Sequence, residues 1–348
     1  MKRTFFASLI ALVCVATMLG QASSAQTRRG SGGAANTKPQ ATTQRPQATA
    51  QTQRTVPLPA SDAVLTVNMR RLLTEALPRA FASDAAKLAE INADIEQFKR
   101  QTGIEARSID TLAVGARFTN PSPDVTKIDH VVVIARGAFN SGTIVAAGRL
   151  ASQGKYSEQQ HNGKAVHVFN VIGEAKLFGL FKIRLREVAL SVLDANTLAI
   201  GEPEAVRAAI DAAGGSGRID AGLLDLAGTA SDVIGYAGNV PASATRDLDF
   251  GMPEITRSIS SIRRFYGGIG MAGTGFQMLT VLRTTGPQDA RSLGDTIEAV
   301  KQIAPGLISM SGSRGKLARG AIESLKVTSQ GSEVQLRIEL SPSDIAGN

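Results

Sequence analysis

Three cationic residues, Lys182, Arg184 and Arg186, alternate with apolar residues in the segment Lys176–Arg186, which reads KLFGLFKIRLR. In an extended strand, successive side chains point to opposite faces. One face of this strand would therefore be apolar, and the other would carry the three charges. Such a strand can contact an anionic lipid surface or an anionic envelope polymer. The structural alternative is an edge strand whose basic residues discourage pairing with another chain.

The apolar positions change phase directly after this segment. They fall on odd numbers up to Leu185 and on even numbers from Val188 onward. Because the side-chain period of a strand is two, an extra residue is needed to keep both runs on one face. We therefore expect a β-bulge or bend near Arg186–Glu187.

Histidine is the other residue type that could bind or catalyse, and the chain has His130, His161 and His167. Asn162-Gly163 predicts a tight hairpin turn, which would place His167 opposite Glu158. This pair could hydrogen-bond or form half of a zinc site. Neither a third ligand nor a helical i, i+4 histidine pair accompanies it, so we predict an ordinary surface pair and no metal site.

Two glycine-containing motifs resemble functional signatures. Gly268–Gly273 matches G-x-G-x-x-G, but a predicted helix precedes it and a strand follows it, which reverses the order of a dinucleotide site. Ser311–Gly315 lacks the first glycine of a nucleophile elbow. We assign no cofactor and no catalytic residue, and interpret the glycine-rich stretch as a place where backbones pack closely.

The clearest architectural unit is Glu187–Gly215, which predicts a hairpin followed by a helix. Alternating apolar residues indicate two strands, and Pro203 is typical of a first helical position. Glu202 and Glu204 place negative charge at the positive end of that helix. These carboxylates would repel phosphate, so the junction is interpreted as a packing unit.

The N-terminal segment has the pattern of a secretory signal. Lys2-Arg3 precedes the apolar run Phe5–Gly20, and small residues end at Ala25. We expect residues 1–25 to be a signal peptide cleaved after Ala25, which makes the protein secreted or periplasmic. The alternative is an uncleaved N-terminal membrane anchor. Cys14 is the only cysteine, so the mature chain would have no disulfide.

Residues 26–60 are rich in Gln, Thr, Ala and Pro and predict a disordered linker. Residues 1–60 contain seven basic and no acidic residues, whereas the rest has 31 basic and 30 acidic ones. The pI of about 9.8 therefore reflects the N-terminus, and nucleic acid is not an expected partner.

The remaining chain predicts an α+β fold. Residues 61–217 and 218–348 each have the element order β-α-β-β-α-β with extra hairpins, which is typical of two tandem ferredoxin-like repeats with antiparallel sheets. One continuous antiparallel sheet with helices on one face is the alternative.

Two segments, Leu193–Ala212 and Ser324–Pro342, resemble parts of uncharacterised secreted bacterial proteins with duplicated α+β domains. The resemblance covers about half of the chain after Ser61 and implies the fold. It implies no activity and no catalytic residues.

These observations favour a non-catalytic cell-envelope protein, a structural or binding module whose partner is an envelope polymer, an anionic lipid or another envelope protein. Two alternatives remain open. One is a hydrolase that uses carboxylates, which would show two carboxyl groups with shifted pKa values in a pocket. The other is a carrier of a hydrophobic ligand, which would show an apolar cavity of several hundred Å³.

Overall fold

A computed structural model describes residues 56–122, 125–177, 181–229, 233–241, 253–308 and 315–346. The predicted signal peptide and most of the predicted linker lie outside these residues.

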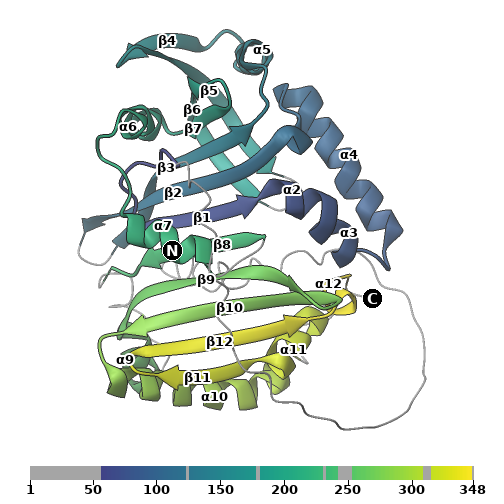
Figure 1. Ribbon diagram of the computed structural model, residues 1–348, viewed down its shortest axis with the longest axis vertical. Helices are drawn as coiled ribbons and strands as arrows, with labels where there is room; N and C mark the ends of the chain where they lie inside the picture. Colours follow the sequence, from purple (N-terminus) through teal and green to yellow (C-terminus); the bar gives the residue numbers. More distant parts are fainter. Residues whose placement is uncertain are drawn as a thin grey trace, which may run out of the picture.

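Within these residues, twelve strands form one sheet, in the order β11-β12-β10-β9-β8-β1-β2-β3-β7-β6-β5-β4. The neighbouring strands pair antiparallel. Figure 1 shows them stacked along the long axis, from β4 at the top to β11 at the bottom. The strands are β1 (Ala63–Asn68), β2 (Ile109–Ser122), β3 (Val125–Gly137), β4 (Tyr156–His161), β5 (Lys164–Leu177), β6 (Phe181–Asp194), β7 (Thr197–Gly201), β8 (Ile234–Asn239), β9 (Ile262–Ala272), β10 (Gly275–Thr284), β11 (Lys326–Gln330) and β12 (Glu333–Leu340).

The predicted α+β class with antiparallel strands is observed, but tandem ferredoxin-like repeats are not shown. In a split βαβ unit another strand lies between the first two, whereas β1 and β2 are direct antiparallel neighbours. The two halves still share a strand order. Outward from the β1–β8 pair, it is β1-β2-β3-β7-β6 on one side and β8-β9-β10-β12-β11 on the other, with β5 and β4 added to the first half.

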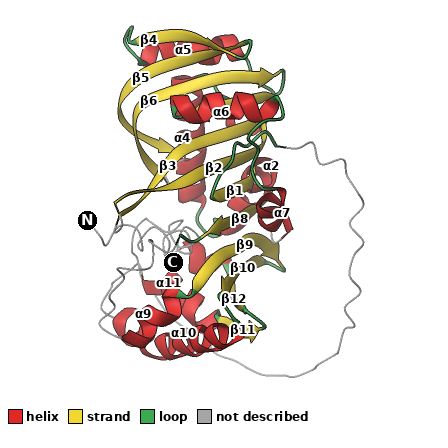
Figure 2. Cartoon of the chain, turned by 90° about the vertical axis from the view of Figure 1, so that its left-hand side faces the viewer, coloured by secondary structure: helices red, strands yellow, loops and turns green. Residues whose placement is uncertain are grey.

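Helices cover both faces of the first-half strands. The helices α4 (Ala85–Thr102) and α5 (Ser141–Ala151) lie on one face, and α6 (Pro203–Ala213) and α7 (Ala221–Thr229) on the other. Figure 2 shows α6 in front of these strands and α4 and α5 behind them. The alternative of one continuous antiparallel sheet is therefore right about the sheet, but its helices on one face only are wrong for this half.

In the second half, α9 (Pro253–Ser260), α10 (Pro287–Ile308) and α11 (Gly315–Ser324) pack on the face that also carries α4, since α4 and α11 share one core cluster. The shorter helices are α2 (Met69–Arg71), η2 (Leu72–Ala76), α3 (Leu77–Ala80), η3 (Ala106–Ser108) and α12 (Pro342–Ala346).

The folded part begins before Ser61, so the predicted linker boundary is too late. Leu58 is 0% exposed and belongs to the core cluster under α6 and α7. Its carbonyl accepts a hydrogen bond from the Ile219 amide at 3.1 Å, and Pro59 forms an isolated bridge with Arg218. Apolar burial of one leucine thus anchors the end of a segment whose composition suggested disorder throughout.

The predicted helix that precedes the Gly268–Gly273 motif is shorter than its apolar spacing indicates. Ile255, Ile259, Ile262 and Tyr266 have helical spacing, but α9 ends at Ser260 and β9 begins at Ile262. β9 pairs with β8 on one side and β10 on the other. Two strand neighbours therefore override a local pattern that fits either element.

The predicted hairpin and helix of Glu187–Gly215 are confirmed. The end of β6 pairs with β7, and α6 starts at Pro203 and buries Val206 and Ile210. Gly201 ends β7 at a close approach, because a Cβ there would overlap the carbonyl oxygen of Val131.

Candidate functional site

The predicted contact residues Lys182, Arg184 and Arg186 lie in the outer part of β6. β6 pairs with β7 only as far out as Ala189, opposite Gly201. Farther out, it pairs with β5 alone, ending at Leu177 opposite Phe181. The segment is therefore an interior strand near the core and one strand of a two-stranded ribbon beyond it. We call residues 173–177 and 181–186 the β5–β6 arm. Its side chains lie outside the described ones.

An irregularity lies at the base of the β5–β6 arm, where the phase change predicted one. Asn170 is opposite Glu187 and Gly173 is opposite Leu185. β5 therefore has two residues in this interval where β6 has only Arg186. The bulge is confirmed in position, but the extra residue is on the partner strand, which sequence reasoning on β6 alone could not show.

A second ribbon leaves the sheet at the same end. Beyond the pair of Val132 with Gly201, β3 pairs with β2 alone. We call residues 117–122 and 125–129 the β2–β3 arm. Both arms leave the sheet at the end of β7 that is marked by Gly201. Ile128 on the β2–β3 arm is 51% exposed.

The carboxylates of Glu202 and Glu204, at the start of α6, contact β3 where the two arms begin. Glu202 accepts hydrogen bonds from the backbone amides of His130, at 3.1 Å, and Val131, at 3.4 Å. His130 has a φ of 53°, and its Nε2 lies 3.4 Å from Glu204. Positive φ is uncommon for a residue other than glycine, so these contacts hold a strained bend in β3. The arrangement supports a structural role for the pair Glu202 and Glu204.

His161 lies at the tip of the β4–β5 hairpin, and it is not freely exposed. Its Nε2 lies 2.8 Å from Oδ1 of Asp211 in α6, and Asn162 donates to the same oxygen at 2.6 Å. The Asn162-Gly163 turn has φ values of 44° and 75°, as predicted for a type I′ turn. These contacts attach the hairpin tip to α6.

The predicted register of Glu158 opposite His167 is confirmed. The prediction of an ordinary surface pair is wrong, because the His167 side chain is largely buried and belongs to a larger polar cluster. The two residues are register partners, with Nδ1 of His167 3.6 Å from Oε2 of Glu158. The hydroxyl of Tyr156 lies 2.7 Å from that oxygen and 2.8 Å from Nδ1 of His167. Arg149 of α5 donates to the Tyr156 hydroxyl at 2.8 Å and lies 4.3 Å from the centre of its ring. We call Arg149, Tyr156, Glu158 and His167 the polar quartet.

Burial changes the pKa values within the polar quartet. The His167 side chain is 13% exposed, and its burial is the main cause that lowers its pKa, with Glu158 opposing the shift. Burial likewise raises the pKa of Tyr156. Desolvation disfavours the charged form of each group, so the imidazole and the phenol are both neutral near pH 7.

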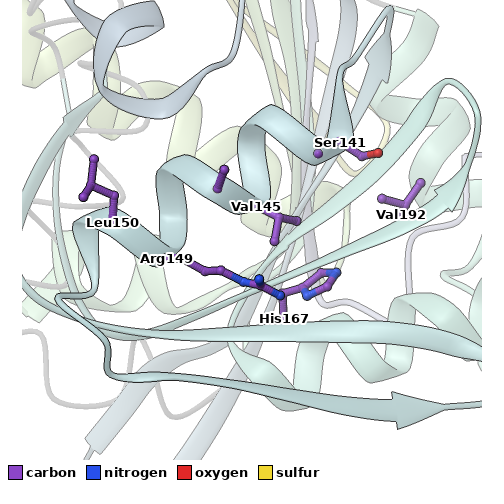
Figure 3. Close-up of a pocket in the computed structure, with 8 residues that line it drawn as sticks. Ser141, Val145, Arg149, Leu150, His167 and Val192 are labelled. Atoms are coloured by element: carbon purple, nitrogen blue, oxygen red, sulfur yellow. The ribbon is translucent and has the colours of Figure 1, made fainter.

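The polar quartet borders a groove of about 730 Å³ between α5 and the sheet. Its wall is mainly apolar, and its lining residues are Ser141, Gly142, Val145, Ala146, Arg149, Leu150, His167 and Val192. Figure 3 shows the side chains of Arg149 and His167 directed toward one another, with Val145 on α5 and Val192 across the opening. Sequence reasoning missed the groove because nothing in the α5 segment indicates where that helix docks.

The other motifs carry no site in the described part of the chain. Gly268 to Met271 continue β9 instead of opening a helix, and a Cβ at neighbouring Gly267 would overlap the Leu279 carbonyl, as expected where backbones pack closely. No group of three or more His, Cys, Asp or Glu side chains in these ranges could hold a metal ion. Within the same ranges, no helix has the length and apolar character needed to cross a membrane. The Ser311–Gly315 motif lies outside the described residues, except for its last glycine.

No family model matches the chain, and no curated protein matches it. The structure resembles TP0453, a protein of Treponema pallidum. Crystal form III of TP0453 has a TM-score of 0.43 at 8% identity, covering 83% of this chain and 94% of that one. Crystal form I has a TM-score of 0.43 at 6% identity, covering 83% and 93%.

Proposed function

We propose that the protein is a non-catalytic binding module of the cell envelope, and that the β5–β6 arm contacts an anionic lipid surface. The observation that carries this proposal is the register of the arm. Residues directly opposite each other in an antiparallel pair lie on the same face. One face thus collects three pairs, which are Leu177 with Phe181, Ala175 with Ile183, and Gly173 with Leu185.

The other face of the arm collects the charges. Lys176 is opposite Lys182, and Glu174 is opposite Arg184, which gives three cations against one carboxylate. Apolar residues on one face and basic residues on the other are the combination that binds at a membrane interface. The β2–β3 arm also begins beyond Gly201 and exposes Ile128, which adds apolar surface beyond this end of β7.

The proposal is tested by vesicle flotation with the full chain. The vesicles contain phosphatidylcholine with or without phosphatidylglycerol. We expect binding only to the anionic vesicles. Near such a surface each basic residue contributes about 1 kcal/mol, so changing Lys182, Arg184 and Arg186 together to Ser should weaken binding by about 3 kcal/mol, or roughly 100-fold.

A matched control removes three charges from the far end of the sheet, by changing Arg291, Lys326 and Arg337 to Ser. These residues are exposed in α10, β11 and β12. Equal loss in both triple variants would show only a net-charge effect and would sink the proposal. Retention of the arm variant on vesicles, or binding to peptidoglycan with none to vesicles, would also contradict it.

A second candidate function, a carrier of a small apolar ligand, is favoured by the groove under α5. Its volume of about 730 Å³ falls in the usual range of small-molecule sites. The carboxylate-dependent hydrolase has no comparable support, since no carboxylate is among the residues that line this groove.

A further inference from the structure

The hydrogen bonds of Tyr156 determine which nitrogen of His167 carries the proton. A phenol has one hydrogen to donate and two lone pairs that accept. A carboxylate can only accept, so the 2.7 Å contact with Glu158 uses the Tyr156 hydrogen. Arg149 can only donate, so it uses one lone pair. Nδ1 of His167, at 2.8 Å, must then donate to the remaining lone pair.

The proton on Nδ1 leaves a lone pair on Nε2. Burial keeps the ring neutral near pH 7, because it lowers the pKa of His167. Within the described residues, the hydrogen bond and the ion-pair contact of the ring are both at Nδ1. His167 lines the groove, so its unpaired acceptor is available to a molecule bound there.

The charges around Nε2 determine which kind of ligand group can donate a hydrogen bond to it. Arg149 lines the same groove, and its positive charge disfavours a cationic donor such as an ammonium group. An anionic oxygen would meet the lone pair of Nε2 without a hydrogen to share, because it can only accept. A neutral hydroxyl avoids both penalties, because it donates one hydrogen and carries no net charge.

We propose that the groove binds a small amphipathic molecule with a neutral hydroxyl, a phenol or an alcohol, which donates its hydrogen to Nε2 of His167. Its apolar part lies against Val145, Ala146 and Val192. The polar quartet acts as a positioning unit, since Tyr156 and Glu158 hold the imidazole in the tautomer that accepts. This inference rests on the second candidate function, the ligand-carrying groove, and is independent of the β5–β6 arm.

The test compares 4-butylphenol with 4-butylanisole, which has a similar shape but no hydroxyl hydrogen. Binding to the full chain is measured by calorimetry and by shifts of the backbone amide signals of Val145, Ala146 and Val192. We expect the phenol to bind about tenfold more tightly, as one hydrogen bond allows. In His167→Phe the two ligands should bind equally, whereas His161→Phe, a histidine change on the same hairpin, should keep the tenfold ratio.

The imidazole nitrogen signals of the wild-type protein provide a second measurement that needs no variant. Free protein should show protonated Nδ1 and unprotonated Nε2, and 4-butylphenol should shift the Nε2 signal. Protonated Nε2 in the free protein, or equal affinity for both ligands, would overturn the proposed hydroxyl contact while leaving an apolar groove. Binding of neither ligand would overturn the groove as a ligand site as well.

Discussion

Replacing Ser191 with alanine should stabilise the protein. Ser191 lies in β6 opposite Ala199 and is 0% exposed. It shares a face with Ala189, in the core cluster under α6. Its Oγ makes no hydrogen bond in the described part of the chain. Folding therefore removes this hydroxyl from water without replacing the hydrogen bonds that it loses.

The expected size follows from this burial. An unpaired buried hydroxyl costs about 1–3 kcal/mol. Removing its single oxygen leaves a small cavity, and this cavity costs less than the loss of one methylene group, which is about 1 kcal/mol. The free energy of unfolding of Ser191→Ala should therefore rise by about 1 kcal/mol, and the melting temperature by about 2–4 °C.

The assay is urea unfolding, read as a change of midpoint at constant slope. Ser261→Ala is the matched control, because Ser261 is also buried but its Oγ donates to the Ser258 carbonyl at 2.6 Å. That variant should lose about 1 kcal/mol. If Ser191→Ala loses as much as Ser261→Ala, the reasoning is refuted, because the Ser191 hydroxyl must then have a partner.

Four further outcomes are expected. Leu58→Ala should lower the free energy of unfolding by about 2–5 kcal/mol in the same urea assay, since Leu58 is fully buried. A change near zero would show that Leu58 belongs to the linker and not to the folded core. Gly163→Ala should lower the stability by about 1–2 kcal/mol in thermal melting, because the φ of Gly163 is +75°. The space around Gly163 is open, so the cost comes from the backbone conformation and not from a clash. An unchanged stability would mean that the turn relaxes to another conformation. Thr280→Val should lower the free energy of unfolding by about 1 kcal/mol in the urea assay, since it removes the 2.6 Å hydrogen bond to Tyr236. A rise in the free energy of unfolding would contradict that hydrogen bond. Burial lowers the pKa of His167 below its ordinary 6.5, so the unfolded chain binds this proton at a higher pH than the folded protein does. The free energy of unfolding should therefore fall as the pH drops through about 6.5 toward the folded-state pKa. His167→Phe should flatten that part of a series of melting curves at different pH, and an unchanged slope would contradict the lowered pKa.

Local signals in the sequence predicted half of the polar quartet. The Asn162-Gly163 turn has a defined geometry, and counting residue pairs back from it gives the register of Glu158 and His167. Arg149 joins the quartet through the packing of α5 on the sheet. A Cβ at Gly148 would overlap the Phe169 ring, so that glycine permits the close approach. Sequence periodicity does not report contacts of this kind.

The positions of the strands were predicted more reliably than their pairing in the sheet. The run Glu333–Leu340 alternates cleanly and matches β12. The pairing of β1 with β8 joins Ala63 to Gly238, and no local pattern relates residues so far apart. This one pair turns two halves into one sheet, which is why the predicted division at Gly217 did not reveal the architecture.

The central position of β1 also imposes an order on assembly. β1 is the first strand within the described residues, yet one of its two edges is completed only by β8. A chain that emerges N-terminus first, from a ribosome or an export channel, therefore presents an open strand edge until residues near 238 have followed. Contacts of such sequence separation form slowly, and an open edge can pair with another chain. The strand edge of β1 is thus open to pairing with another chain while the C-terminal half is still arriving.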